Sequence, residues 1–139
     1  MAAPERSGAV VADTHAFIWY LEGSSRLSAA AARHLEACDE TGVVHISAYT
    51  LVEVRYLVGK GALRADEEAA LLAAVDSPRT DIRSVPASVE VVRHLASVPR
   101  SRLFDPADRL IVASAIELGV PLVTKDAGIA SSGLLECIW

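Results

Sequence analysis

The sequence has only two cysteines, Cys38 and Cys137, which form no C-x-x-C pair and have no histidine nearby at metal-ligand spacing. We therefore expect two reduced core thiols without a chemical role. Long apolar runs are also missing, since no stretch approaches the roughly 18 residues that a membrane span requires. The first residues, MAAPERSG, lack the basic and apolar regions of a signal peptide, so we expect a cytoplasmic protein that is not inserted in a membrane.

Positive charge is scarce as well. The formal net charge is -5, which argues against a protein that coats nucleic acid without sequence preference, because such binding relies on Lys and Arg neutralising phosphates. Nucleic acid bound in a local groove remains compatible with this charge. The basic residues are mostly arginine, which suits bidentate phosphate contacts better than lysine does.

What the chain has in abundance is apolar surface. Hydrophobic residues make up 52% of the 139 residues, charged residues only 22%, and the mean hydropathy is +0.33. The length suits one domain with a sizeable core, and there is no repeat, low-complexity segment or linker. We therefore expect a single domain over residues 1–139, with its surplus apolar surface buried in the core or against a partner.

Apolar stretches alternate along the chain between strand-like and helix-like patterns. Strands alternating with helices at this spacing indicate crossover connections, and hence an α/β fold with a mainly parallel central sheet and helices on both faces. The expected strands are 8–13, 42–47, 81–85, 120–126 and 134–139, and the expected helices are 14–22, 28–40, 48–61, 64–77, 86–98 and 105–119.

Acidic residues occur beside several of these apolar elements. Asp13 and Asp126 end two expected strands, and ligands of open α/β sheets bind outside the carboxyl ends of the strands. Taken singly, both could be ordinary turn or cap residues, and Asp105 before Pro106 has the pattern of a helix N-cap. Glu53, within TLVEVRYLV, is harder to explain as structural, because a carboxylate in so apolar a helix loses hydration unless it is paired.

The predicted topology brings Asp13, Glu53, Asp108 and Asp126 toward one edge of the sheet. Carboxylates in one pocket repel one another and raise one another's pKa values unless a cation offsets them. Because the ligands are all oxygen, the expected ion is Mg²⁺ or Mn²⁺ rather than Zn²⁺. Such an ion can generate a hydroxide nucleophile and stabilise charge on a phosphoryl oxygen.

Four motifs, in order over nearly the whole chain, carry a family resemblance: VADTHAFIW, ISAYTLVEV, DPADRLIVASA and LVTKDAGI. The sequence resembles PIN-domain ribonucleases, specifically the VapC toxins of bacterial VapBC-type toxin–antitoxin pairs. The resemblance implies a PIN-like fold and a metal-dependent endoribonuclease that cleaves RNA phosphodiester bonds by metal-activated water. It also implies a small VapB-type antitoxin as partner, and a homodimer would account for the apolar surplus.

The resemblance also assigns roles to individual residues. It implies that the four acids named above bind the metal, and that Thr14 and Thr124 orient water or phosphate beside them. Asp105 belongs to the family pattern too, as a cap or a contact around the site. Aromatic residues common in the family are replaced by Ala107 and Ile129, which bears on substrate fit.

Other candidate residues have ordinary interpretations beside functional ones. Arg109 could contact phosphate or form a salt bridge to an acid. His15 is expected to be structural or solvent-facing, and the stretch AFIWYL is expected in the core or in a partner surface.

A second function class stays open at this stage, namely a PIN-like module that binds RNA or protein without cleaving. The complete set of four acids favours the enzyme, since a binding module needs no such cluster. A phosphotransfer protein is disfavoured, because DTHAF lacks a second aspartate two residues after the first.

Overall fold

Five short strands lie side by side in one parallel sheet at the centre of the computed structural model, which describes residues 8–99 and 105–139. The strands are β1 (Ala9–Ala12), β2 (Val43–Ser47), β3 (Ile82–Val85), β4 (Leu122–Val123) and β5 (Cys137–Ile138), in the order β3-β2-β1-β4-β5. All four neighbouring pairs are parallel, which confirms the expected sheet. The chain builds the sheet outward from β1 in both directions, so the crevice at the switch point lies between β1 and β4.

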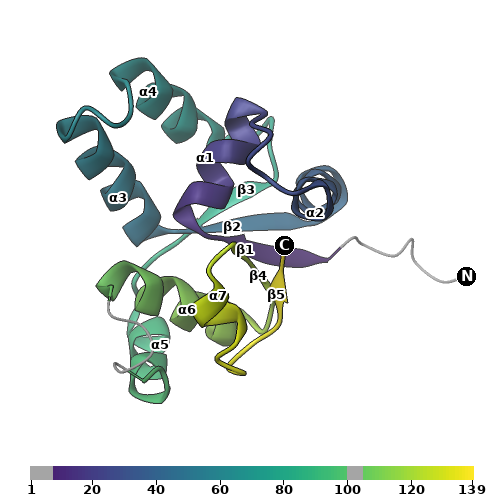
Figure 1. Cartoon of the computed structure of the whole chain (residues 1–139), viewed down its shortest axis with the longest axis vertical. Coiled ribbons are helices and arrows are strands. Elements are labelled where there is room, and N and C mark those ends of the chain that lie inside the picture. The colour runs from purple at the N-terminus through teal and green to yellow at the C-terminus, as the bar shows by residue number, and fades with distance from the viewer. Residues whose placement is uncertain (1–7, 100–104) are drawn as a thin grey trace, which may run out of the picture.

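Helices cover both faces of this sheet, as expected. Figure 1 shows α1 and α2 on one side of the strands, α5, α6 and α7 on the other, and α3 and α4 extending beside α1. Their bounds are α1 Thr14–Glu22, α2 Ala29–Thr41, α3 Ala48–Gly59, α4 Ala65–Ala74, α5 Val89–Arg93, a 3-10 turn η1 His94–Ser97, α6 Pro106–Leu118 and α7 Ala127–Ala130. None of the helices in the described ranges has the length and apolar character needed to cross a membrane.

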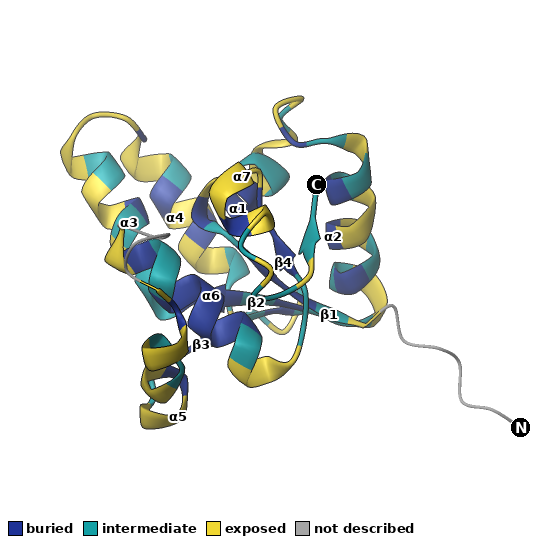
Figure 2. Cartoon of the chain, turned by 60° about the horizontal axis from the view of Figure 1, so that its bottom comes forward, coloured by how far each residue is buried: buried dark blue, intermediate teal, exposed yellow. Residues whose placement is uncertain are grey.

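Alternating side chains of the strands divide the core between the two faces. Val10 and Ala12 of β1 pack with residues of α1, α2 and α3, whereas Val11 between them packs with α6 and α7. Figure 2 shows the buried residues along the strands and α6, and the exposed residues on the outer sides of the helices. Fully burying one such aliphatic side chain contributes about 1.5–3 kcal/mol, so the helix layers on both faces stabilise the sheet.

The structure differs from the sequence-based expectation in three places. The expected helix over 86–98 begins only at Val89, because Ser88 Oγ accepts the N–H of Val91 and so forms the N-cap, and it tightens into the 3-10 turn after Arg93. The strands expected over 120–126 and 134–139 are only two residues long each. Helix α7 was not predicted, because four residues are too few to show a helical period.

A close backbone approach near the start of β1 generates a test of this fold. A Cβ on Gly42 would lie 1.7 Å from the carbonyl oxygen of Gly8, whereas a Cβ on Gly59 at the end of α3 would meet nothing within 4 Å. We expect Gly42→Ala to lower the free energy of unfolding by about 1–3 kcal/mol, because the strand must shift. Gly59→Ala should raise it by about 0.5–1 kcal/mol through helix propensity. Urea unfolding of both variants measures the difference, and equal effects would contradict the described packing.

Candidate active site

The carboxyl ends of β1 and β4 hold the first two acids. Asp13 follows β1 and is the N-cap of α1, with Oδ1 accepting the N–H of Ala16 at 2.8 Å, while its own N–H donates to Val123 O at 3.1 Å. Asp126 is the N-cap of α7, with Oδ1 accepting the N–H of Ile129 at 3.0 Å. Backbone hydrogen bonds therefore fix both carboxylates at the switch point of the sheet.

Thr124 links these two acids. Its hydroxyl oxygen accepts the N–H of Asp126 at 3.1 Å, and its side chain hydrogen-bonds the carboxylate of Asp13. The residue is buried, and it is absent from the lining of the cavity described below. Thr124 therefore holds the two acids in place relative to each other through hydrogen bonds, and it does not face the cavity.

Glu53 reaches the same region from the middle of α3 and is oriented by two buried threonines. The Thr14 hydroxyl donates to Glu53 Oε1 at 2.5 Å, and the hydroxyl oxygens of Thr14 and Thr50 are 3.1 Å apart. Since the single hydroxyl proton of Thr14 goes to Glu53, Thr50 donates to Thr14. Thr50 was not predicted from the sequence, although its spacing of three residues from Glu53 places both on one face of the helix.

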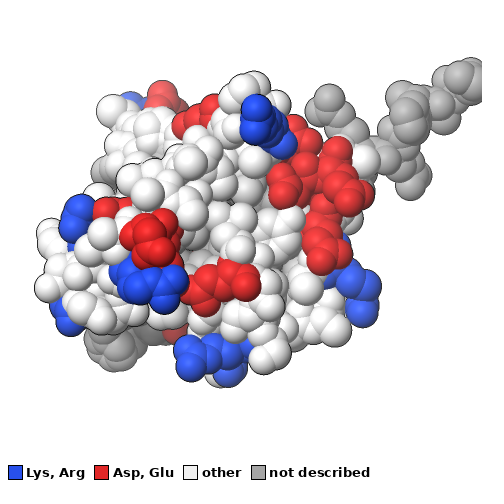
Figure 3. All heavy atoms as spheres, turned by 90° about the horizontal axis from the view of Figure 1, so that it is seen from above, with Lys and Arg blue, Asp and Glu red and all other residues white. Residues whose placement is uncertain are grey.

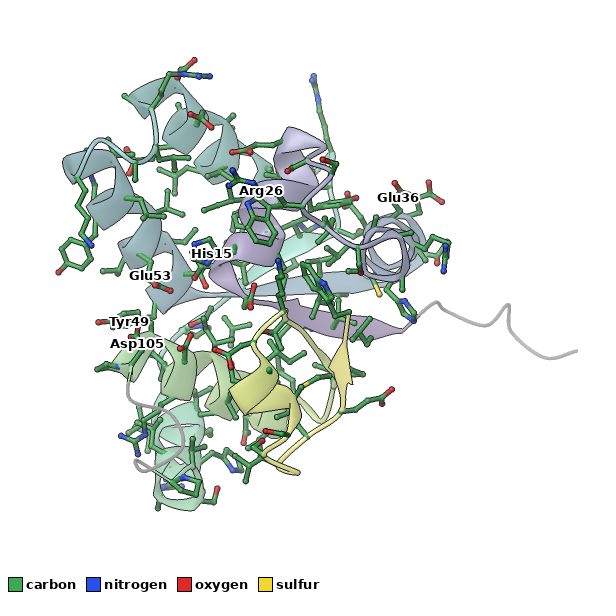
Figure 4. All side chains as sticks on the ribbon, in the orientation of Figure 1. His15, Arg26, Glu36, Tyr49, Glu53 and Asp105 are labelled. Carbon is green, nitrogen blue, oxygen red and sulfur yellow. The ribbon has the colours of Figure 1, made fainter. Side chains whose placement is uncertain are left out.

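The first turn of α6 supplies two more acids. Asp105 is the N-cap, accepting the N–H of Ala107 at 2.8 Å, which confirms the cap that the Asp-Pro pattern predicted. Asp108 lies inside the turn. Figure 4 shows Asp105 near Glu53 of α3 and His15 of α1, where the three elements meet.

All four predicted acids, together with Asp105, line one cavity of about 550 Å³. Thr14, His15, Trp19 and Lys125 complete its lining. The structure therefore brings together acids that lie up to 113 positions apart in the sequence, from Asp13 to Asp126.

The carboxylates in this cavity disfavour one another's ionisation. Burial raises the pKa of Asp108 to about 6, and the charges of Asp105, Asp126, Glu53 and Asp13 add to the effect. Burial likewise raises the pKa of Asp13, although the Thr124 hydroxyl and the Ala16 amide oppose the shift. The pKa of Glu53 is raised mainly by burial and further by Asp105, against the hydrogen bond from Thr14.

This donor set suits a hard divalent cation. The acids offer only oxygen ligands, and a cation offsets both the burial and the mutual repulsion that raise the pKa values of Asp108, Asp13 and Glu53. No three Asp, Glu, His or Cys side chains within residues 8–99 and 105–139 are already arranged around one ion position. Mg²⁺ is nevertheless commonly held by one or two carboxylates and several waters, so the site does not need a full protein cage.

Other predicted residues lie outside the cavity or at its rim. Arg109 donates from Nη2 to Leu95 O at 3.0 Å and to Val98 O at 3.2 Å, so it anchors η1 to α6 and does not line the cavity. Ala107 and Ile129 are each only 1% exposed. Ile129 therefore lies in the core, whereas Ala107, although almost fully buried, lines a small neighbouring cavity together with Glu53 and Asp105.

The stretch AFIWYL is mostly core. Phe17 and Ile18 are buried, Trp19 and Tyr20 pack against the same cluster, and Leu21 is 36% exposed. His15 is exposed and lies at the cavity, with its ring centroid 5.6 Å from that of Trp19.

Comparison with known proteins identifies the family that has this sheet order and this acid-lined edge. The family model of the PIN domain matches residues 10–132. Over 127 residues the chain is 35% identical to Ribonuclease VapC22 of Mycobacterium tuberculosis, covering 88% of this chain and 90% of that protein. The chain therefore belongs to the PIN-domain family, among the VapC proteins.

Solved structures share the fold at lower sequence identity. VapBC2 from Rickettsia felis, solved bound to a DNA fragment from its promoter, has a TM-score of 0.69 at 17% identity, covering 93% of this chain and 96% of that one. VapC20 of Mycobacterium tuberculosis, a toxin that cleaves the sarcin–ricin loop, has a TM-score of 0.65 at 20% identity, with 91% and 97% covered. Both confirm the predicted PIN-like architecture.

Neutralising Asp108 tests the cost of burying its charge beside the other carboxylates. Because the pKa of Asp108 is higher in the folded chain than its ordinary value of 3.8, its protonated form favours folding, and this contribution is lost as the pH rises through about 6. In EDTA at neutral pH we expect Asp108→Asn to increase the free energy of unfolding by about 1 kcal/mol, after allowance for solvent screening.

The gain should vanish near pH 4, where Asp108 of the unmodified chain is protonated. Urea unfolding at both pH values measures it. Asp66→Asn is the matched control, because Arg64 lowers the pKa of this exposed acid and no such gain is expected. A gain for Asp108→Asn of equal size at both pH values would disprove the electrostatic cause.

Proposed function

We propose that this chain is a metal-dependent endoribonuclease that acts as the toxin of a VapBC-type toxin–antitoxin pair. The observation that carries the proposal is the convergence of Asp13, Glu53, Asp108 and Asp126, from separate elements, in one cavity. The 35% identity to a VapC ribonuclease supports the same activity. We further propose that residues 1–139 form a single PIN domain, and that it acts in the cytoplasm, where RNA substrates are available.

The acids divide into two groups by their surroundings. Asp13, Asp108 and Asp126 hold a Mg²⁺ or Mn²⁺ ion, with Thr124 keeping the first and last of them in place. When bound, such a cation would stabilise charge on a phosphoryl oxygen and lower the pKa of water, so that hydroxide is available as the nucleophile at neutral pH. Glu53 comes from α3, and the Thr14 hydroxyl holds its carboxylate in one orientation, where it would position water or complete the ligand set.

A non-cleaving RNA- or protein-binding module is the alternative. Crowded acids that raise the pKa of Asp108 would weaken RNA binding in such a module, since they repel phosphate. The face seen in Figure 3 carries patches of acidic side chains between separate basic ones, with no continuous basic surface among the atoms it describes. Both observations favour a local, cation-assisted site over a general nucleic-acid surface.

Two apolar surfaces are available for protein partners. A cavity of about 300 Å³ between α1 and α4 is lined by the apolar residues Ile18, Leu21, Ala70 and Leu71 and by the charged residues Glu22, Arg64, Asp66 and Glu67. We assign this groove to a helix of the antitoxin, because an amphipathic helix fits an apolar groove with a charged edge. Val89 on α5 is 61% exposed, and we assign this side of the molecule to the homodimer.

Cleavage should depend on both the cation and the acids. We expect the purified chain to lose RNA cleavage in EDTA and to regain it with Mg²⁺ or Mn²⁺, because a divalent ion offsets the charge of the acids and the phosphate. Asp13→Asn should lower the cleavage rate by about 100-fold or more, since it removes a ligand charge but keeps a side chain that caps α1.

Denaturing gels of total RNA, with fragment ends mapped, provide the measurement. Asp66→Asn, the same change at an exposed position on α4, is the control and should cleave at the normal rate. Undiminished cleavage in EDTA would exclude the metal mechanism. If Asp13→Asn arrests growth as strongly as the unmodified chain does, toxicity does not require cleavage, and the non-cleaving binding module becomes the better explanation.

The partner surfaces are tested by charge insertion. We expect Leu21→Glu to abolish complex formation with a cognate VapB-type antitoxin, because a carboxylate among the apolar residues of the groove loses hydration. Val89→Glu should convert the homodimer into a monomer and leave the complex intact. Light scattering coupled to gel filtration measures both assemblies. A complex that survives Leu21→Glu would place the antitoxin on another surface.

A further inference from the structure

The chain contains only two lysines, Lys60 and Lys125, and both lie beside the acidic centre. Lys125 lines the main cavity of about 550 Å³. Lys60 lines a second, smaller cavity of about 180 Å³. Glu53 and Asp105 line both cavities, so the two hollows adjoin at the acids and each has one lysine.

An aromatic group accompanies Lys125. Its Nζ lies 5.9 Å from the ring centroid of Trp19, within the range of a cation–π contact. The Trp19 ring packs against two other rings. Its centroid lies 5.6 Å from that of His15 and 6.0 Å from that of Trp139, which meets it edge-on. Trp19 is only half-buried, so part of its indole remains at the cavity surface.

Aromatic groups also accompany Lys60. Tyr49 and Tyr56 line the second cavity with it, and Tyr56 is 63% exposed. Tyr49, Glu53 and Tyr56 follow the spacing i, i+4, i+7 along α3, which places all three on one side of the helix. Figure 4 shows Tyr49 and Glu53 on the part of α3 that faces Asp105.

These two aromatic–lysine pairs have the chemistry of a single-stranded nucleic-acid path. Unpaired bases stack on aromatic rings, and the phosphates between them require positive charge. Positive charge from a lysine is needed most near the acids, because five carboxylates repel the phosphates of the substrate backbone. Arg109 does not supply it, since its guanidinium is engaged by the carbonyls of Leu95 and Val98.

We propose that a single RNA strand crosses the acidic centre between two stations, Trp19–Lys125 on one side and Tyr56–Lys60 on the other. The proposal rests on the ribonuclease function proposed above and adds the substrate path to it. Each station stacks one base and neutralises one backbone phosphate, so that the strand between the stations passes over the acids. Recognition of an unpaired strand thus follows from the side chains that line the two cavities.

The test measures RNA binding separately from cleavage. In an Asp108→Asn background that keeps RNA intact, with Mg²⁺ present, Lys60→Ala and Lys125→Ala are titrated against a fluorescein-labelled pool of short random-sequence single-stranded RNAs. Arg33→Ala, on the exposed side of α2, removes the same charge away from both cavities and is the matched control. Fluorescence anisotropy over a salt series gives the dissociation constant and its salt slope.

We expect each lysine variant to reduce the salt slope by about 0.7, the value for one phosphate contact on a single strand, and Arg33→Ala to leave the slope unchanged. Trp19→Leu should weaken binding by between about fivefold and a hundredfold, because it keeps apolar bulk and loses stacking, and Trp19→Phe should restore much of the loss. With Trp139→Phe, Trp19 is the only tryptophan, and bound RNA should quench its emission.

The outcomes separate this path from the function on which it rests. If the unmodified chain cleaves RNA while both lysine variants retain the slope of Arg33→Ala, the path is overturned and the ribonuclease stands. If Trp19→Leu and Trp19→Phe bind equally well, the Trp19 station is overturned. If the unmodified chain neither cleaves total RNA nor binds the pool, the ribonuclease function fails, and the path fails with it.

Discussion

The repulsion among five carboxylates in one cavity is the constraint on which the rest of the site depends. Backbone dipoles partly offset this repulsion. Asp13, Asp105 and Asp126 are the N-caps of α1, α6 and α7. The N-terminus of a helix carries partial positive charge, so each of these acids lies where the backbone favours an anion. Asp108 lies in the first turn of α6 without being its cap, and burial, with the neighbouring charges adding to it, raises its pKa to about 6.

This arrangement explains why structural and functional interpretations of the acids competed in the sequence. Capping and site formation were treated as alternatives for Asp13, Asp105 and Asp126, yet the structure gives each of them both roles. The gathering of the acids was predictable, because strand ends in a parallel sheet meet at one edge. The β-branched runs and the helical spacing between them were sufficient to predict the sheet and its two helix layers.

Features that depend on tertiary contacts were not predictable from the sequence. Arg109 was expected to contact phosphate or to form a salt bridge to an acid, but its partners are carbonyls of the 3-10 turn and its C-cap, which the apolar period did not indicate. Thr50 helps to orient Glu53 only because α3 packs beside α1, which brings its hydroxyl within hydrogen-bond distance of Thr14. The pairing of Trp19 with Lys125 likewise joins residues 106 positions apart and leaves no local pattern.

The double role of the capping acids has an evolutionary consequence. A descendant that lost catalysis would still be under selection to keep a capping side chain at positions 13, 105 and 126, because replacing an N-cap by alanine destabilises a helix by about 1 kcal/mol. Retained Asp or Asn at these positions is therefore weak evidence of activity among relatives. Glu53 lies within α3 and Asp108 inside the first turn of α6, so neither is held by capping. In a sequence comparison, these two positions should diverge first when a PIN domain of this kind ceases to be an enzyme.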